Sequence, residues 1–213
     1  MQGPVADIFD TIHLMAKQGV PNYFGSQRYG HNHMNVTYAQ EMLSGGRVVR
    51  DRKKKGIYLS AARSYLFDKV LAERVRQGNW SQAVDGDCMM LDGTHSIFTI
   101  DARDATIDRR IAEFDIHPTG PLWGAGERKV SMQAQAIEDQ ALAESNELMR
   151  GLEQIRVKMA RRELRLKPVD LSYDQPEAGM LKFNFILPAG QYATTLLREL
   201  AMLEDASRLK QDD

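Results

Sequence analysis

The sequence lacks several features that mark large classes of proteins. It has a single cysteine, Cys88, among 213 residues, which excludes an internal disulfide framework and is typical of a reducing compartment. No stretch approaches the ~20 apolar residues of a membrane-spanning helix. The first residues, Met-Gln-Gly-Pro-Val-Ala-Asp, have neither the basic nor the apolar region of a secretory signal. We therefore expect a cytoplasmic protein with no membrane partner.

Signatures of cofactor and metal chemistry are also missing. There is no P-loop and no GxGxxG motif, so nothing indicates a nucleotide cofactor. His31 and His33 lie two residues apart without a nearby third ligand, which is a weak pattern for a metal site. Cys88 stands in an apolar run and is expected to be buried and unreactive. We expect neither a metal nor a cofactor.

The net charge of −1 does not by itself indicate a nucleic-acid partner, but the basic residues are unevenly distributed. Residues 47–55 contain six basic groups and one acidic group, and residues 156–167 contain the same numbers. Two such clusters on a neutral background are able to hold a polyanion from two sides. The alternative is that both are solvated faces of the protein.

Hydrophobic periodicity predicts a mixed α/β (α+β) fold without a repeating βαβ order. Helices are predicted at 4–18, 35–44, 58–77, 104–114, 133–164 with a break near Gly151, and 192–204. Ser60 is the expected N-cap of the third helix, and Gly19 and Gly78 are expected to end the first and third. Strands are predicted at 83–84, 88–91, 96–100, 171–173 and 181–187, with loops at 22–30 and 117–126.

Two segments have the composition of a binding site rather than of a core. Residues 22–30, Asn-Tyr-Phe-Gly-Ser-Gln-Arg-Tyr-Gly, combine aromatic, amide and guanidinium groups with two glycines, which favours a tight loop that presents side chains to a ligand. Residues 187–200 place a Pro-Ala-Gly turn before a helix that starts at Tyr192, and helix N-termini offer free N–H groups. The alternative is that Tyr192 packs against its neighbours while Arg198 is a surface charge paired with Glu199 or Glu204.

The same segments resemble a known family. Residues 19–30, 59–67 and 185–199 resemble, in this order, sequence blocks of the tRNA pseudouridine synthase D (TruD) family, and 84–87 and 120–124 are weaker matches. Asp68 stands where the family pattern has asparagine. The matching blocks extend over most of the chain.

The resemblance implies an isomerase that acts on a uridine at position 13 in the dihydrouridine arm of tRNA, without metal or cofactor. The base is detached from its sugar, turned and rejoined through carbon. By this resemblance Asn22 would hydrogen-bond the uridine, Phe24 would help to bind it, Tyr192 would stack on its ring and Arg198 would pair with the catalytic carboxylate. The expected contacts to the RNA backbone are Arg28, Arg47, Arg50, Arg52, Lys53 and Lys54.

The sequence departs from the family in one respect. The family's nucleophile is an aspartate in a Gly-x-Lys-Asp motif that precedes the Asn-Tyr-Phe-Gly loop, and no Lys-Asp pair occurs here. We interpret the chain as a C-terminal portion, whether as a fragment, a truncated reading frame or half of a split protein. Residues 1–47 and 167–213 are then the remaining parts of the synthase catalytic domain, and residues 48–166 a TRUD insertion domain.

This interpretation predicts that the chain alone is inactive. It also predicts that the chain pairs with the missing N-terminal half, or with itself, through a sheet edge that the missing strands leave exposed. The alternative is a non-catalytic RNA-binding remnant of such an enzyme.

Overall fold

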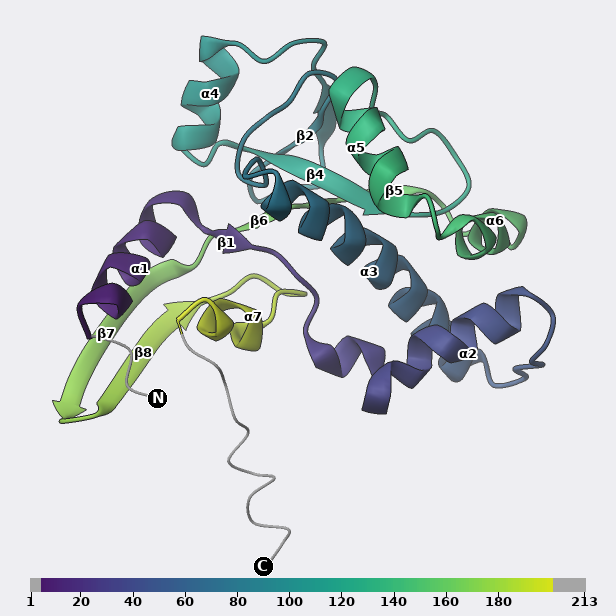
Figure 1. Cartoon of the computed structure of the whole chain (residues 1–213), viewed down its shortest axis with the longest axis horizontal. Helices are drawn as coiled ribbons and strands as arrows, with labels where there is room; N and C mark the ends of the chain where they lie inside the picture. Colours follow the sequence, from purple (N-terminus) through teal and green to yellow (C-terminus); the bar gives the residue numbers. More distant parts are fainter. Residues whose placement is uncertain (1–4, 201–213) are drawn as a thin grey trace, which may run out of the picture. The chain divides into compact units, whose positions relative to one another are not determined.

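The computed structural model describes residues 5–200, with the backbone alone for residues 5–7 (Figure 1). Contacts divide the chain into two compact units, which are described separately. Unit 1 comprises Met1–Val20 with Lys167–Asp213, and unit 2 comprises Pro21–Leu166. The structure confirms the predicted mixture of helices and sheet. The division into functional domains at residues 47 and 167 stays a prediction, because the units separate instead after Val20 and after Leu166.

Unit 1 consists of helices flanking a two-stranded antiparallel sheet. Gly19 ends the first helix with φ of 75°, as expected, and its N–H donates to the carbonyl of Met15. In the sheet, Tyr173 contacts the ring of Phe183, and its ring centroid lies 5.3 Å from that of Phe9 in the helix. The elements are α1 (Val5–Gln18), β7 (Val169–Glu177), β8 (Met180–Ile186) and α7 (Ala193–Arg198).

The sheet of unit 1 is largely exposed. Val169, Met180 and Ile186 are 41%, 51% and 60% exposed. A two-stranded sheet is marginally stable unless it packs against other elements. The alternation at 181–187 predicts β8 closely, whereas β7 is longer than the predicted 171–173. Of the helix predicted at 192–204, residues 201–204 lie outside the described residues.

Unit 2 is built on an antiparallel sheet with strand order β3-β2-β4-β5. The long helix α3 runs beside this sheet and contacts β4, α5 and α2 (Figure 1). Its buried residues Leu66 and Val70 form a core with Trp123, Leu142 and Leu152. The elements are β1 (Val20–Pro21, at the boundary), η1 (Ser26–Tyr29), η2 (His31–His33), α2 (Met34–Leu43), α3 (Arg52–Arg76), β2 (Cys88–Leu91), β3 (Ile97–Thr99), α4 (Ala105–Ala112), β4 (Ile116–Leu122), α5 (Met132–Leu142), α6 (Asn146–Gln154), β5 (Ala160–Glu163) and β6 (Arg165–Leu166).

Helix α3 begins six residues before the predicted start, and Ser60 is not its N-cap. The cap is Asp51, whose carboxylate accepts hydrogen bonds from the N–H groups of Lys53 and Lys54 at 2.8 and 3.1 Å. The sequence pattern missed this start because basic residues fill the first turn, where the helix dipole disfavours them. The predicted end is right, since Gly78 follows the helix with φ of 71°.

The predicted loop at 117–126 is wrong, because residues 116–122 form β4, an inner strand of the sheet. Two prolines and a glycine conceal it from pattern analysis. Gly120 is needed for packing, since a Cβ there would lie 3.0 Å from the ring of Phe67. Leu164 lies opposite Pro118, and its N–H donates a hydrogen bond to the Pro118 carbonyl. Pro118 has no N–H to donate in return, and the Leu164 carbonyl accepts its hydrogen bond from the N–H of Asn22.

The predicted helix at 133–164 is also wrong in its second half. The chain breaks between α5 and α6, not at Gly151, and residues 160–163 form β5. Gly151 lies inside α6, where a Cβ would come within 2.7 Å of Leu43 Cβ, so its role is close helix packing. The predicted strand at 83–84 is absent from the described structure; Ala83 and Val84 are buried in the approach to β2. No helix within residues 5–200 is long and apolar enough to cross a membrane.

Candidate functional site

The Asn22 side chain is fixed at both ends of its amide. Asn22 is fully buried, and its Nδ2 donates a hydrogen bond of 3.0 Å to the carbonyl of Glu163. Its Oδ1 accepts a hydrogen bond of 2.7 Å from Nη2 of Arg162. With the backbone bond to Leu164, these contacts attach the start of the 22–30 loop to β5 and the residue after it.

The Phe24 side chain lies between a cation and a second aromatic ring. The Arg162 guanidinium lies 4.2 Å from the centroid of the Phe24 ring, a distance at which the cation is attracted to the ring face. The Phe24 ring meets that of Phe67 on α3 edge to face, with centroids 5.6 Å apart. The predicted loop is therefore a packed structure, with Phe24 only 8% exposed.

Asp68 attaches the same loop to α3. Its Oδ1 accepts a hydrogen bond of 3.1 Å from the N–H of Phe24, and its Oδ2 accepts one from the Tyr29 hydroxyl. Burial raises the pKa of this carboxyl from its usual 3.8 to about 6, against the opposing effects of those hydrogen bonds and of the nearby Arg162. Burial therefore makes the charged form of the Asp68 carboxyl less stable than it would be in water.

Arg28 serves the packing of this loop. Its Nη1 donates to the Ser60 hydroxyl at 2.9 Å, which is the role the structure gives Ser60 in place of a helix cap. Its guanidinium carbon also lies 5.4 Å from the Phe24 ring centroid. These contacts keep Arg28 within the loop's own network, and its predicted contact with an RNA backbone stays a prediction.

The first basic cluster lies at the start of α3 and is largely exposed. Arg50, Arg52, Lys53 and Lys54 are exposed, and the last three lie in the first turn. Arg47 differs from them, since it pairs with Glu41 and stacks on the ring of Tyr38 at 4.1 Å. The free cations at this end of α3 therefore come mainly from residues 50–55.

The second basic cluster is not the exposed face that its composition suggests. Arg161 is buried, with an ion pair of 2.8 Å to Glu138 and hydrogen bonds to Thr119. Arg165 is buried against His117 and the carbonyls of Ile111 and Ile116, and burial lowers its pKa to about 10. These arginines hold strands together, which rules them out as surface contacts to RNA.

Tyr192 and Arg198 lie at opposite ends of α7 in unit 1. Tyr192 is the N-cap residue, as the sequence predicts, and Thr195 N–H donates to its carbonyl at 3.0 Å. Arg198 is exposed at the last turn. Within residues 5–200 no ion pair joins Arg198 to Glu199, and both side chains are exposed.

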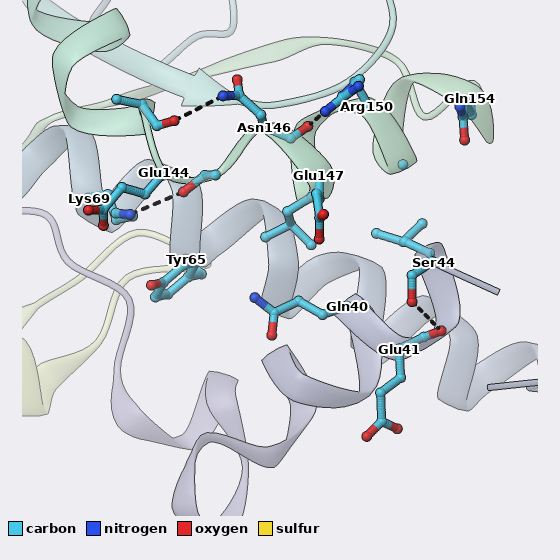
Figure 2. A pocket seen from close by; sticks show the side chains of 15 residues that line it. Gln40, Glu41, Ser44, Tyr65, Lys69, Glu144, Asn146, Glu147, Arg150 and Gln154 are labelled. Atoms are coloured by element: carbon cyan, nitrogen blue, oxygen red, sulfur yellow. Dashed lines mark hydrogen bonds between the residues drawn. The ribbon is translucent and has the colours of Figure 1, made fainter. Parts of the chain in front are cut away.

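A cavity of about 910 Å³ lies elsewhere in unit 2, between the end of α2, the middle of α3 and the start of α6 (Figure 2). Its lining mixes the cations Lys69 and Arg150 with the carboxylates Glu41, Glu144 and Glu147. Lys69 is engaged within the wall, since its Nζ donates to Ser145 Oγ at 3.1 Å. None of the sequence-predicted site residues lines this cavity.

Over residues 5–200 no group of three or more histidine, cysteine or acidic side chains is placed to hold a metal ion. Cys88 is buried, as expected, and burial raises the pKa of its thiol.

Arg162 is the functional candidate that the sequence pattern missed. It lies in the cluster at 156–167, whose composition resembles a single charged face, yet in the structure it contacts both Asn22 and Phe24. The strand alternation of β5, which buries Arg161 while Arg162 faces the loop, would have separated their roles. The prediction of a helix there concealed that signal.

Comparisons with known proteins identify the family of this chain. Residues 47–200 match the family model described as tRNA pseudouridine synthase D (TruD). A tRNA pseudouridine synthase D of Nitrosococcus oceani is 41% identical over 206 residues, which cover 96% of this chain and 58% of the relative. That of Methylococcus capsulatus is 47% identical over 182 residues, covering 85% and 51%.

The fold has a counterpart among solved structures. The crystal structure of a protein assigned to TruD from Methanosarcina mazei superimposes with a TM-score of 0.70 at 20% identity, covering 92% of this chain and 64% of that one. The chain thus spans little more than half the length of the curated relatives above. The match of the family model over most of the chain shows that it belongs to the tRNA pseudouridine synthase D (TruD) family.

Proposed function

We propose that residues 1–213 form part of a cytoplasmic tRNA pseudouridine synthase that converts a uridine, at position 13 of the D arm, to pseudouridine. The observation that carries the proposal is the 41–47% identity to relatives named tRNA pseudouridine synthase D over 85–96% of this chain. The substrate is tRNA, and the chain's part in the reaction is to bind it and hold the target base.

In this proposal the loop at 22–30 holds the uracil ring. Asn22 hydrogen-bonds the base, Phe24 shapes its pocket, and Tyr192 stacks on it. Asn22 and Phe24 are buried in the free chain, so the base reaches them only when RNA binding uncovers this loop. A Tyr192→Ala variant is expected to bind RNA more weakly by about 1–3 kcal/mol, because the base no longer stacks on an aromatic ring.

The cations of residues 50–54 bind the RNA backbone in this proposal. Basic side chains in the first turn of a helix oppose the helix dipole, typically by about 0.3–1 kcal/mol each. Arg52, Lys53 and Lys54 occupy that turn of α3 and are exposed. The charges of these side chains add to the positive potential at the N-terminus of the helix, and a positive potential there attracts phosphate groups. Binding of a polyanion therefore accounts for residues that do not stabilise the helix.

Replacing Arg50, Arg52, Lys53 and Lys54 with alanine tests this interface. We expect weaker binding of an unmodified tRNA transcript and a slope of log K against log salt that is shallower by about 0.9 for each phosphate that is no longer neutralised. The free energy of unfolding of unit 2 should not fall, because Asp51 still caps α3. The matched control removes four exposed cations elsewhere in unit 2, namely Arg76, Arg109, Lys129 and Arg150. Equal slopes for the two variants would contradict the assignment.

The nucleophile is proposed to come from outside residues 1–213, since these contain no Lys-Asp pair. Asp51 caps α3 and Asp87 is buried in an ion pair with Arg74, so both have structural roles here. Arg198 is proposed to pair with the incoming carboxylate. The exposed edge of the β7–β8 sheet is proposed to take up the strands that accompany it, or else a second copy of this chain.

A further inference from the structure

The Asn22 amide is held in one orientation by two partners of opposite kind. The Arg162 guanidinium can only donate hydrogen bonds, so it faces Oδ1, and the Glu163 carbonyl can only accept them, so it faces Nδ2. Turning the amide over would set N–H groups against N–H groups and one oxygen against another. Both hydrogen bonds would break at once, inside a fully buried site.

This arrangement leaves a defined pattern for a ligand. An amide group has two donors and two acceptor positions, and the bonds to Arg162 and Glu163 use one of each. One N–H of Nδ2 and one lone pair of Oδ1 remain, and the two bonds fix which end of the amide donates and which end accepts.

The remaining pattern matches uracil and not cytosine. Uracil presents an N3–H donor next to its O4 acceptor, which meet Oδ1 and Nδ2–H of Asn22 respectively. Cytosine in the same pose presents an N3 acceptor and an N4 amino donor, so like groups oppose each other at both positions. A freely rotating asparagine would accept either base by turning over.

We propose that Arg162 is a positioning residue that locks the Asn22 amide and so makes the site select uridine over cytidine. This inference rests on the proposed function, because it takes the base to be bound at Asn22. Stacking of the Arg162 guanidinium on Phe24 holds it in place for this task. We assign this role to Arg162 because its side chain donates the hydrogen bond to the amide oxygen, whereas Glu163 contributes only its backbone carbonyl.

The test measures the binding of two tRNA transcripts that differ only in carrying uridine or cytidine at the target position. The wild-type chain should prefer the uridine transcript by about tenfold or more. Arg162→Met keeps the length and the apolar contact with Phe24 but has no donor, and its preference should fall to within about twofold. Arg162→Lys keeps a charged donor and should restore part of the preference. The exposed control Arg109→Met should behave as wild type.

The possible outcomes distinguish failure of this inference from failure of the proposed function. A variant Arg162→Met that weakens both transcripts equally would show a merely structural role and overturn the inference. Equal binding of both transcripts by the wild-type chain would also overturn it while leaving tRNA binding intact. If the wild-type chain binds neither transcript, the proposed function fails and the inference falls with it. If Arg162→Met does not fold, the wild-type preference and its partial reduction in Arg162→Lys still decide the question.

Discussion

Replacing Arg74 with methionine should destabilise unit 2 by about 3–5 kcal/mol, which is a large part of the stability of a typical domain. Arg74 on α3 and Asp87 before β2 are 2% and 1% exposed and form two parallel hydrogen bonds of 3.1 and 3.0 Å. Arg74 also donates to the carbonyls of Asn79 and Gln82. Methionine would fill the space but leave the carboxylate of Asp87 buried without its cation.

The effect is measured by urea unfolding followed through the fluorescence of Trp80 and Trp123, both of which lie in unit 2. Adding Asp87→Asn to the variant should recover part of the stability, because it removes the buried unpaired charge. The control is Arg76→Met on the same helix, whose side chain is 65% exposed and whose pair with Glu73 should contribute under about 1 kcal/mol. Similar decreases in stability at Arg74 and Arg76 would contradict this account of the buried pair.

Replacing Asp68 with asparagine, the residue of the family pattern, should stabilise the chain at pH 8 by about 1–3 kcal/mol. The Asp68 carboxylate is charged at this pH, and burial makes the charge costly, which is why its pKa is raised to about 6. Asparagine keeps an oxygen for the N–H of Phe24 and presents an amino group to the Tyr29 hydroxyl, which can accept as well as donate. The loop thus keeps its attachment to α3 without the buried charge.

The sign of the pH dependence follows from the raised pKa. Between the unfolded value of 3.8 and the folded value of about 6, the folded chain binds more protons at Asp68 than the unfolded chain. The stability that Asp68 contributes is therefore present below pH 3.8 and is lost as the pH rises through about 6. Asp68→Asn should differ little from wild type near pH 4 and increasingly above it. A constant difference between pH 4 and pH 8, or the same change in the exposed control Asp101→Asn, would show the assignment to be wrong.

Periodicity predicted those elements whose residues follow a simple pattern. The alternation at 181–187 and the helical spacing in 4–18 were sufficient to locate β8 and α1. Strand β4 was not predicted because proline and glycine normally end strands. In the structure, Gly120 allows α3 to pack closely against the strand. Pro118 has no N–H to donate, and the Leu164 carbonyl accepts a hydrogen bond from the N–H of Asn22. Local propensity carries no information about such tertiary contacts.

The site was predictable in part for the same reason. The motif at 19–30 predicted Asn22 and Phe24 as site residues, which stays a prediction, and the structure brings them together with Arg162 and Asp68. The partner Arg162 lies 140 positions from Asn22, and only the fold reveals which of several neighbouring arginines is near. Arg161 and Arg165 looked equivalent to it in sequence but are buried in contacts between other elements.

The most direct test of the account is whether residues 1–213 bind tRNA without modifying it. The chain is incubated with an unmodified transcript, binding is measured in parallel, and pseudouridine is detected by mass spectrometry. We expect binding that weakens with salt and no pseudouridine until a polypeptide with the part of the Methylococcus capsulatus relative that this chain does not match is added. Pseudouridine formed by residues 1–213 alone would contradict the claim that the nucleophile lies outside them, and absence of binding would contradict the proposed function.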